Sequence, residues 1–474
     1  MRLLPKTMRR SFVLLAGAMV VAGGALLVGR ATGAPSAELE GAPLEASAQP
    51  AEEVAAFVQL GDKTPIPAPS PRAATPVPPS AIATPPTGAA AMPTTAGAPA
   101  ASPPLGAMID LDKIERVTDH YEAPLKDGRR AVLTLDPDLQ SLAEKLLDQA
   151  RAPRGAIVVM APDGRILALA GRRTEEPKGA VKGTFDWRLA TDVWAPAASV
   201  FKLVTATALV GAGVTGSDKV CFHGGLRSVT EANLMDDKRD SRCESLAYGV
   251  AHSNNAILGK LAYQKLQPPA LESAARSLGL FDALPGAELP GNAGKLTLPA
   301  THDLEFAKTA AGFVNTQLSV AGGALLAATF ADRGEQPVPH LIASIDGQPV
   351  AAAAGKRVLS AEAAGEVARM MVGTCDSGSA SRSFGRRSDL KVAGKTGTLA
   401  QSAPFYMEHS WFVGFAPAEK PQVIVSVLFG NAENWHLKGH EAARKLIDRA
   451  LRPATQREKD RTAAIAPRSR GDRD

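Results

Sequence analysis

Apolar positions along this chain recur with two periods, which predict where strands and helices lie. Short apolar runs are typical of buried strands, and five of them cover 156–160, 166–171, 390–393, 410–416 and 423–429. Apolar residues at helical spacing predict a helix after Asp136, its expected N-cap, and a last helix over 440–451. The middle of the chain is largely helical in pattern. Two early and three late strands separated by helices fit one mixed sheet packed by helices on both faces.

One predicted helix differs from the others because it is apolar on every face. It covers 196–210, and Lys202 is its only charged residue. Gly211 is expected to lie just past its end, as the C-terminal cap. A lone buried lysine is costly unless it is paired or used chemically. Ser199 lies three residues earlier and therefore on the same face. The pair predicts a serine nucleophile that gives its proton to a lysine of lowered pKa.

Two further motifs raise the significance of this pair. Alone, Ser-x-x-Lys also fits a core serine beside a lysine that reaches the surface. The sequence Ser253-Asn254-Asn255 comes just before an amphipathic helix. Later, 395–398 reads Lys-Thr-Gly-Thr at the expected end of the 390–393 strand. Each motif is common alone, but the three in this order are specific.

In this order the motifs resemble those of the penicillin-binding protein transpeptidase domain. That family lies in the penicilloyl serine transferase superfamily, which also holds the serine β-lactamases. The resemblance covers roughly residues 130–452. It implies a mixed α/β (α+β) fold, with a five-stranded antiparallel sheet between helix layers and an all-helical lobe. The active site is expected at the boundary between sheet and lobe.

The resemblance also implies a role for each motif residue. Ser199 would be the nucleophile, Lys202 the general base and Ser253 a proton relay to the leaving amine. Backbone N–H groups of Ser199 and Thr398 would form the oxyanion hole. The substrate-binding residues implied are Asn255, Lys395, Thr396, Gly397 and Thr398. We expect Gly397 to leave room for the substrate along the strand.

The substrate implied by the resemblance is the D-alanyl-D-alanine end of a peptidoglycan stem peptide. Acyl transfer to an amine gives a cross-link, and transfer to water gives carboxypeptidase action. β-Lactam antibiotics mimic the dipeptide and would acylate Ser199. No cofactor or metal is implied. A cell-wall synthesis complex is a further partner to expect.

Two rival functions carry different sequence signals. A class A β-lactamase needs a glutamate for deacylation, and Glu288 stands four residues before Asn292. That segment reads as a Pro-Gly turn, so we interpret Glu288 as structural. A non-catalytic β-lactam sensor usually has several membrane spans, whereas one apolar span is visible here.

The first 34 residues are predicted to be a cytoplasmic tip with a membrane anchor or a signal peptide. Four basic residues precede an uncharged run over 11–29, which is just long enough to span a membrane. The basic flank directs the C-terminal side across. Since Ala34 offers only a mediocre cleavage site, we expect an uncleaved single anchor. The catalytic domain would then face the periplasm from the bacterial inner membrane.

Composition divides the remaining residues into three parts. Residues 35–105 are rich in proline and alanine, with Phe57 as their only aromatic residue, which predicts a disordered linker. Residues 106–455 would form the transpeptidase domain, without a glycosyltransferase or pedestal domain. Residues 456–474 mix basic and acidic residues and predict a solvated tail. The net charge of +5 is spread along the chain, so nucleic-acid binding is not predicted.

The cysteines and histidines give weaker signals. Cys221 and Cys243 bracket a polar segment and are a candidate disulfide in an oxidising compartment, with two reduced thiols as the alternative. No role is predicted for Cys375. His436 and His440 lack the other ligands of a zinc site, so we expect both at the surface.

Overall fold

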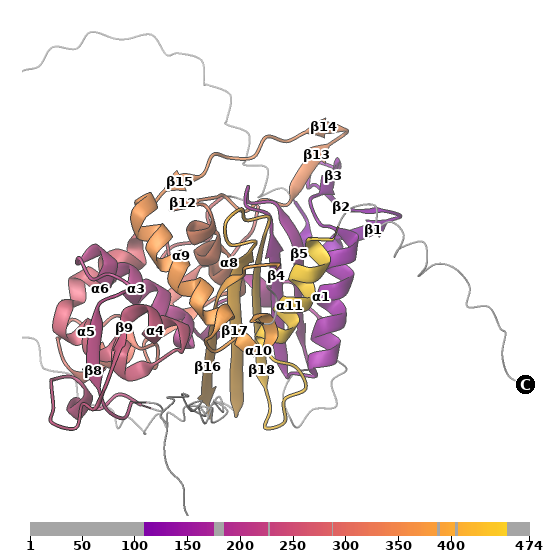
Figure 1. The fold of residues 1–474 in the computed structure, drawn as a ribbon. Helices are drawn as coiled ribbons and strands as arrows, with labels where there is room; N and C mark the ends of the chain where they lie inside the picture. The colour runs from indigo at the N-terminus through magenta and orange to yellow at the C-terminus, as the bar shows by residue number, and fades with distance from the viewer. Residues whose placement is uncertain are drawn as a thin grey trace, which may run out of the picture. The chain divides into compact units, whose positions relative to one another are not determined.

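A six-stranded antiparallel sheet is the centre of the fold (Figure 1), in the order β16-β17-β18-β4-β5-β6. Its strands are β4 (Arg154–Met160), β5 (Ile166–Arg173), β6 (Thr184–Phe185), β16 (Ala393–Gln401), β17 (Met407–Ala416) and β18 (Val423–Asn431). Because β18 pairs with β4, the early and late strands form one sheet. The predicted five-stranded antiparallel sheet is confirmed, with the two-residue β6 added at one edge.

The computed structural model describes residues 109–174, 184–225, 228–286, 288–385, 389–402 and 406–452. The predicted anchor (1–34), linker (35–105) and tail (456–474) lie outside these residues. Within the described part of the chain, no helix combines the length and apolar character needed to cross a membrane.

Helices cover both faces of the sheet, as predicted. Successive residues of β4 alternate between the faces. Ile157 packs in one cluster with the leucines of α1 (Pro137–Ala150) and α11 (Gly439–Ala450), whereas Val158 packs in another with α8 (Val320–Ala331). The predicted cap of α1 is confirmed, since Asp136 Oδ1 accepts from two backbone N–H groups of the first turn at 2.9 and 3.1 Å.

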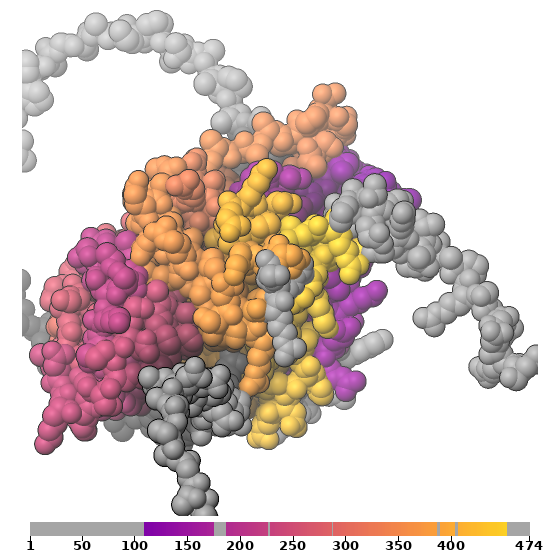
Figure 2. All heavy atoms as spheres, viewed as in Figure 1, coloured from indigo at the N-terminus to yellow at the C-terminus, as the bar shows by residue number. Residues whose placement is uncertain are grey.

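A helical lobe lies beside the β16 edge, drawn in magenta and pink in Figure 1. Its helices are α3 (Lys202–Gly211), α4 (Leu246–Ala251), α5 (Asn255–Lys265), α6 (Pro268–Ser277) and α7 (Leu304–Ala310). Helix α9 (Ala361–Asp376) packs between lobe and sheet, against both α4 and β16. On the face seen in Figure 2, the magenta and pink lobe residues adjoin orange residues of the C-terminal part.

A second sheet was not predicted from the sequence. It is built from β1 (Glu115–Val117), β2 (His120–Pro124), β3 (Arg130–Leu133), β13 (Ile342–Ile345) and β14 (Gln348–Pro349). These strands are short, and β1 is exposed throughout, so they carry little apolar periodicity.

Short elements complete the described chain. The strands are β7 (Ala195–Pro196), β8 (Lys219–Phe222), β9 (Arg242–Ser245), β10 (Gly294–Leu296), β11 (Thr316–Leu318), β12 (Glu335–Gln336) and β15 (Lys356–Arg357). The helices are α2 (Arg188–Thr191), α10 (Ser381–Phe384) and the 3-10 turns η2 (Leu111–Lys113), η3 (Ala198–Phe201) and η4 (Glu231–Asn233).

Two local predictions were wrong. Gly211 is the last residue of α3 rather than its cap, and the chain turns only at Gly213, which has φ +87°. His440 is buried, because the N-terminus of α11 packs on β17, where the Gly439 N–H donates to Ser410 Oγ at 3.0 Å. His436 is exposed, as expected.

Candidate active site

The nucleophile candidate lies in a tight turn that neighbouring segments hold in place. Ser199 is in η3, directly before α3, and the preceding Ala198 has a left-handed φ of +49°. This conformation is strained for a residue with a side chain. A Cβ on Gly312 would lie 2.2 Å from the Ala198 carbonyl oxygen, so only glycine allows this contact. The Trp411 indole N–H also donates to the Pro196 carbonyl at 2.9 Å, which ties the turn to β17.

Lys202 has three partners and is fully buried. Its Nζ lies 2.6 Å from Ser199 Oγ, 2.7 Å from Asn255 Oδ1 and 2.8 Å from the Ala311 carbonyl oxygen. A neutral amine has two N–H donors and one lone pair. The Asn255 and Ala311 oxygens can only accept, so they take the two donors. The lone pair then faces the Ser199 hydroxyl, which is the geometry of a general base.

Electrostatics favour the neutral form of Lys202. Burial lowers the pKa of its amine well below the usual lysine value, and the nearby positive charge of Lys395 lowers this pKa further. Lys202 therefore becomes neutral at a lower pH than an exposed lysine. This agrees with the lowered pKa predicted from the sequence.

The second motif joins α4 to α5. Ser253 has a φ of +56°, and Asn254 caps α5 by accepting from the Ile257 N–H at 3.0 Å. The cap fixes where α5 begins, so Asn255 becomes its first residue and turns its side-chain oxygen to Lys202. The three consecutive residues therefore have different roles: Ser253 forms the turn, Asn254 caps α5, and Asn255 accepts a hydrogen bond from Lys202.

The third motif lies within β16 rather than after a strand, so the strand predicted at 390–393 was placed too early. Lys395 and Thr396 are buried with their polar groups hydrogen-bonded, and two buried polar residues hid the strand from an apolar pattern. Lys395 is fully buried and donates to Ser253 Oγ and to the Thr396 carbonyl, both at 2.9 Å. The second and third motifs therefore meet through this lysine.

The structure gives Gly397 a reason other than the predicted one. A Cβ there would lie 3.2 Å from the Val200 side chain and 3.3 Å from the Val200 backbone nitrogen. The glycine lets β16 approach the turn that carries Ser199, so its first effect is on protein packing rather than on room for substrate.

Several site residues were missed by sequence reasoning. The Ala311 carbonyl carries no side-chain signal, and Gly312 stands in an unremarkable stretch. Ser379 lies in the loop after α9, with its hydroxyl 2.5 Å from the Thr396 hydroxyl. None of the three has a motif that single-sequence reading could use.

The Glu288 carboxylate is held by backbone hydrogen bonds of another segment. It accepts from the backbone N–H groups of Leu341 and Ile342, at 2.6 and 2.8 Å. The side chain thus fastens its loop to the start of β13. This agrees with the structural interpretation of Glu288.

The two candidate disulfide cysteines are directly opposite each other in the β8–β9 hairpin, and their sulfur atoms are bonded. The buried Lys260 of α5 donates to the Cys221 carbonyl at 2.9 Å and to the Asp240 carboxylate at 2.6 Å. The hairpin is therefore fastened to the helix that begins with Asn255.

Cys375 is buried in α9, and burial raises the pKa of its thiol well above the usual value, which makes it unreactive. Among the residues the structure describes, no group of three or more His, Cys, Asp or Glu side chains could hold a metal ion.

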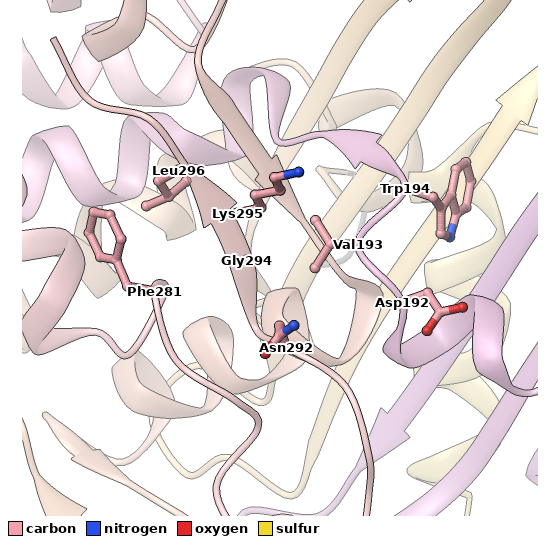
Figure 3. A pocket seen from close by; sticks show the side chains of 8 residues that line it. All are labelled: Asp192, Val193, Trp194, Phe281, Asn292, Gly294, Lys295 and Leu296. Atoms are coloured by element: carbon pink, nitrogen blue, oxygen red, sulfur yellow. The ribbon is translucent and has the colours of Figure 1, made fainter. Parts of the chain in front are cut away.

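A pocket of about 630 Å³ is lined by residues other than those of the three motifs (Figure 3). Phe281 and Leu296 line one end, and Trp194 and Asp192 line the other. It holds none of the motif residues, and although Asp192 and Lys295 line it, its lining has no hydroxyl or thiol that such a group could activate as a nucleophile. The chemistry is therefore assigned to the three motifs.

Comparison with known proteins identifies the family. The family model described as penicillin binding protein transpeptidase domain matches residues 155–450, more than half of the chain. The chain belongs to this family. The match includes every residue of the three transpeptidase-domain motifs.

Relatives and solved structures agree with this assignment. The transpeptidase domain is similar to the peptidoglycan D,D-transpeptidase PbpA of Mycobacterium tuberculosis, with 24% identity over 67% of this chain and 70% of the relative. It is also similar to the probable peptidoglycan D,D-transpeptidase PenA of Neisseria flavescens, with 27% identity over 68% and 82%. The penicillin G acyl-enzyme complex of M. tuberculosis penicillin-binding protein A has the same fold, with a TM-score of 0.53, 23% identity and coverage of 69% and 81%. The predicted fold class and family are thus confirmed.

Proposed function

We propose that this protein is a penicillin-binding D,D-transpeptidase or D,D-carboxypeptidase that acts on D-alanyl-D-alanine stem peptides of peptidoglycan. The observation that carries the proposal is the contact of 2.6 Å between Lys202 Nζ and Ser199 Oγ, with the other Lys202 partners arranged as acceptors. The names of the relatives supply the substrate class.

Acylation begins when Lys202 takes the Ser199 proton. The Ser199 oxygen then attacks the carbonyl carbon of the penultimate D-alanine, and the carbonyl oxygen becomes an oxyanion held by the backbone N–H groups of Ser199 and Thr398. As ammonium, Lys202 has three donors, and three acceptors surround it. The same geometry therefore serves both of its protonation states.

Collapse of the intermediate breaks the peptide bond and releases the terminal D-alanine. Ser253 relays to the departing amine the proton that Lys202 took from Ser199, so that Lys202 is neutral again and Ser253 keeps a hydroxyl proton; the charge of Lys395 at 2.9 Å makes the Ser253 hydroxyl a better donor. An acceptor amine or water then attacks the Ser199 ester, which restores the serine. Lys395, Thr396 and Thr398 bind the terminal carboxylate in this scheme, and Asn255 holds the peptide amide.

The cellular setting is part of the same proposal. A single N-terminal anchor in the bacterial inner membrane would place the domain in the periplasm, close to stem peptides and other cell-wall enzymes. The bonded Cys221 and Cys243 support an oxidising compartment. β-Lactams would bind as mimics of the dipeptide and acylate Ser199.

The test is covalent labelling of the full-length chain in detergent with a fluorescent penicillin, followed by mapping of the labelled peptide. We expect one label, on Ser199, and none in Ser199→Ala. Release of D-alanine from a stem-peptide substrate would support the enzyme over a sensor. Label on another residue, or equal label in Ser199→Ala, would overturn the assignment.

A further inference from the structure

Ser379 lies outside the three motifs, but its hydroxyl is 2.5 Å from the hydroxyl of Thr396, a residue of the third motif. Ser379 belongs to the turn between α9 and α10, and its backbone N–H donates to the Ala251 carbonyl at 3.0 Å. A Cβ on Gly378 would lie 2.1 Å from the same carbonyl oxygen. The turn is therefore packed against the end of α4, two residues before Ser253, while its serine reaches β16.

The number of protons available determines which of the two hydroxyls, Ser379 or Thr396, donates to the other when substrate is bound. A carboxylate can only accept, so Thr396 must give its single proton to the terminal carboxylate that it is proposed to bind. The contact between the two hydroxyls then requires Ser379 to donate to Thr396. Donation to a hydroxyl also polarises it and makes it a stronger donor.

We infer that Ser379 is a positioning residue for carboxylate recognition: it holds and polarises the Thr396 hydroxyl, and so selects substrates with a free C-terminal carboxylate. This inference rests on the proposed function. Ser379 acts through Thr396 and needs no contact with the reacting atoms. Its contribution should therefore appear only when the ligand carries a carboxylate.

The experiment compares benzylpenicillin with its methyl ester, which has the same reactive ring but no carboxylate. Acylation rates of the full-length protein are followed by intact-protein mass spectrometry. The variants are Ser379→Ala, Ser379→Thr, which keeps a hydroxyl, and Ser377→Ala, an exposed serine of the same turn as matched control.

We expect Ser379→Ala to slow acylation by benzylpenicillin about 3–10-fold, the range for one lost hydrogen bond, and to leave acylation by the ester unchanged. Ser379→Thr should restore the benzylpenicillin rate, and Ser377→Ala should match the unmodified protein. An equal loss with both ligands would indicate a purely structural turn and overturn the inference. An unaltered rate in Ser379→Ala would also overturn it and leave the proposed function standing, whereas no acylation of the unmodified protein would overturn both.

Discussion

Replacing Asn255 by aspartate tests whether Lys202 works as a neutral base. The substitution keeps the shape of the side chain but places a negative charge about 2.7 Å from Lys202 Nζ. An opposite charge at this range stabilises the ammonium form and raises a lysine pKa by about 1–3 units. The expected shift opposes the burial and the Lys395 charge that keep this pKa low.

The magnitude follows from the fraction of neutral lysine. At a pH below the pKa of Lys202, each unit by which that pKa rises lowers the neutral fraction about tenfold. Acylation near neutral pH should therefore slow by about 10–1000-fold. As the pH rises, the neutral fraction recovers, and the rate of Asn255→Asp should approach that of the unmodified protein. The acid limb of the pH–rate profile therefore moves to higher pH.

The assay is the second-order acylation rate with a fluorescent penicillin, measured from about pH 6 to 10, the range that brackets a lowered lysine pKa. Asn254→Asp is the matched control, because aspartate caps a helix as well as asparagine does. It should leave the profile almost in place. If Asn255→Asp lost the same factor at every pH, the loss would be geometric and the argument about the lone pair would be refuted.

Three other predictions follow from described contacts. Glu288→Gln should lower the free energy of unfolding by about 1–2 kcal/mol, since a charged acceptor for two N–H groups becomes neutral, and should leave decay of the penicilloyl adduct unchanged; fast turnover that this variant abolishes would favour a β-lactamase. Burial lowers the pKa of His409 to about 4. On acidification, the unfolded chain therefore takes up a proton at His409 before the folded chain does, and the free energy of unfolding should fall by about 2 kcal/mol between pH 7 and 5. Urea unfolding of His409→Gln should lack this contribution to the pH dependence. Cys221→Ser with Cys243→Ser should cost about 3 kcal/mol in the chain-entropy picture, and an unaltered thermal midpoint under oxidising conditions would contradict this.

Local chemistry explains what the sequence could predict. The cap of α1 and the Ser199–Lys202 pair depend on spacings of two to three residues, which helix geometry converts directly into contact. The contact of Ser253 with Lys395 joins residues 142 apart. Only the family resemblance could bring those two together in advance.

The missed features have physical reasons. In the β16 strand, Ala393 and Gly394 are followed by Lys395 and Thr396, whose burial depends on partners from other segments, so the strand could not be found from an apolar pattern. In the second sheet, the edge strands β1 and β14 are exposed throughout, and the alternation of β2 and β3 covers too few residues to be detected. The Ala311 carbonyl is invisible in a sequence, because every residue has one.

The pairing of β18 with β4 has a consequence for how the protein is made. Directly opposed residues such as Val159 and Val425 are more than 250 positions apart in the sequence. Strands this distant give a high contact order, which slows folding. The central sheet can close only after residue 431, the end of β18, has left the ribosome. Until then the edge of β4 that pairs with β18 stays open and the site lacks Lys395, and an unpaired strand edge of this kind is prone to aggregation.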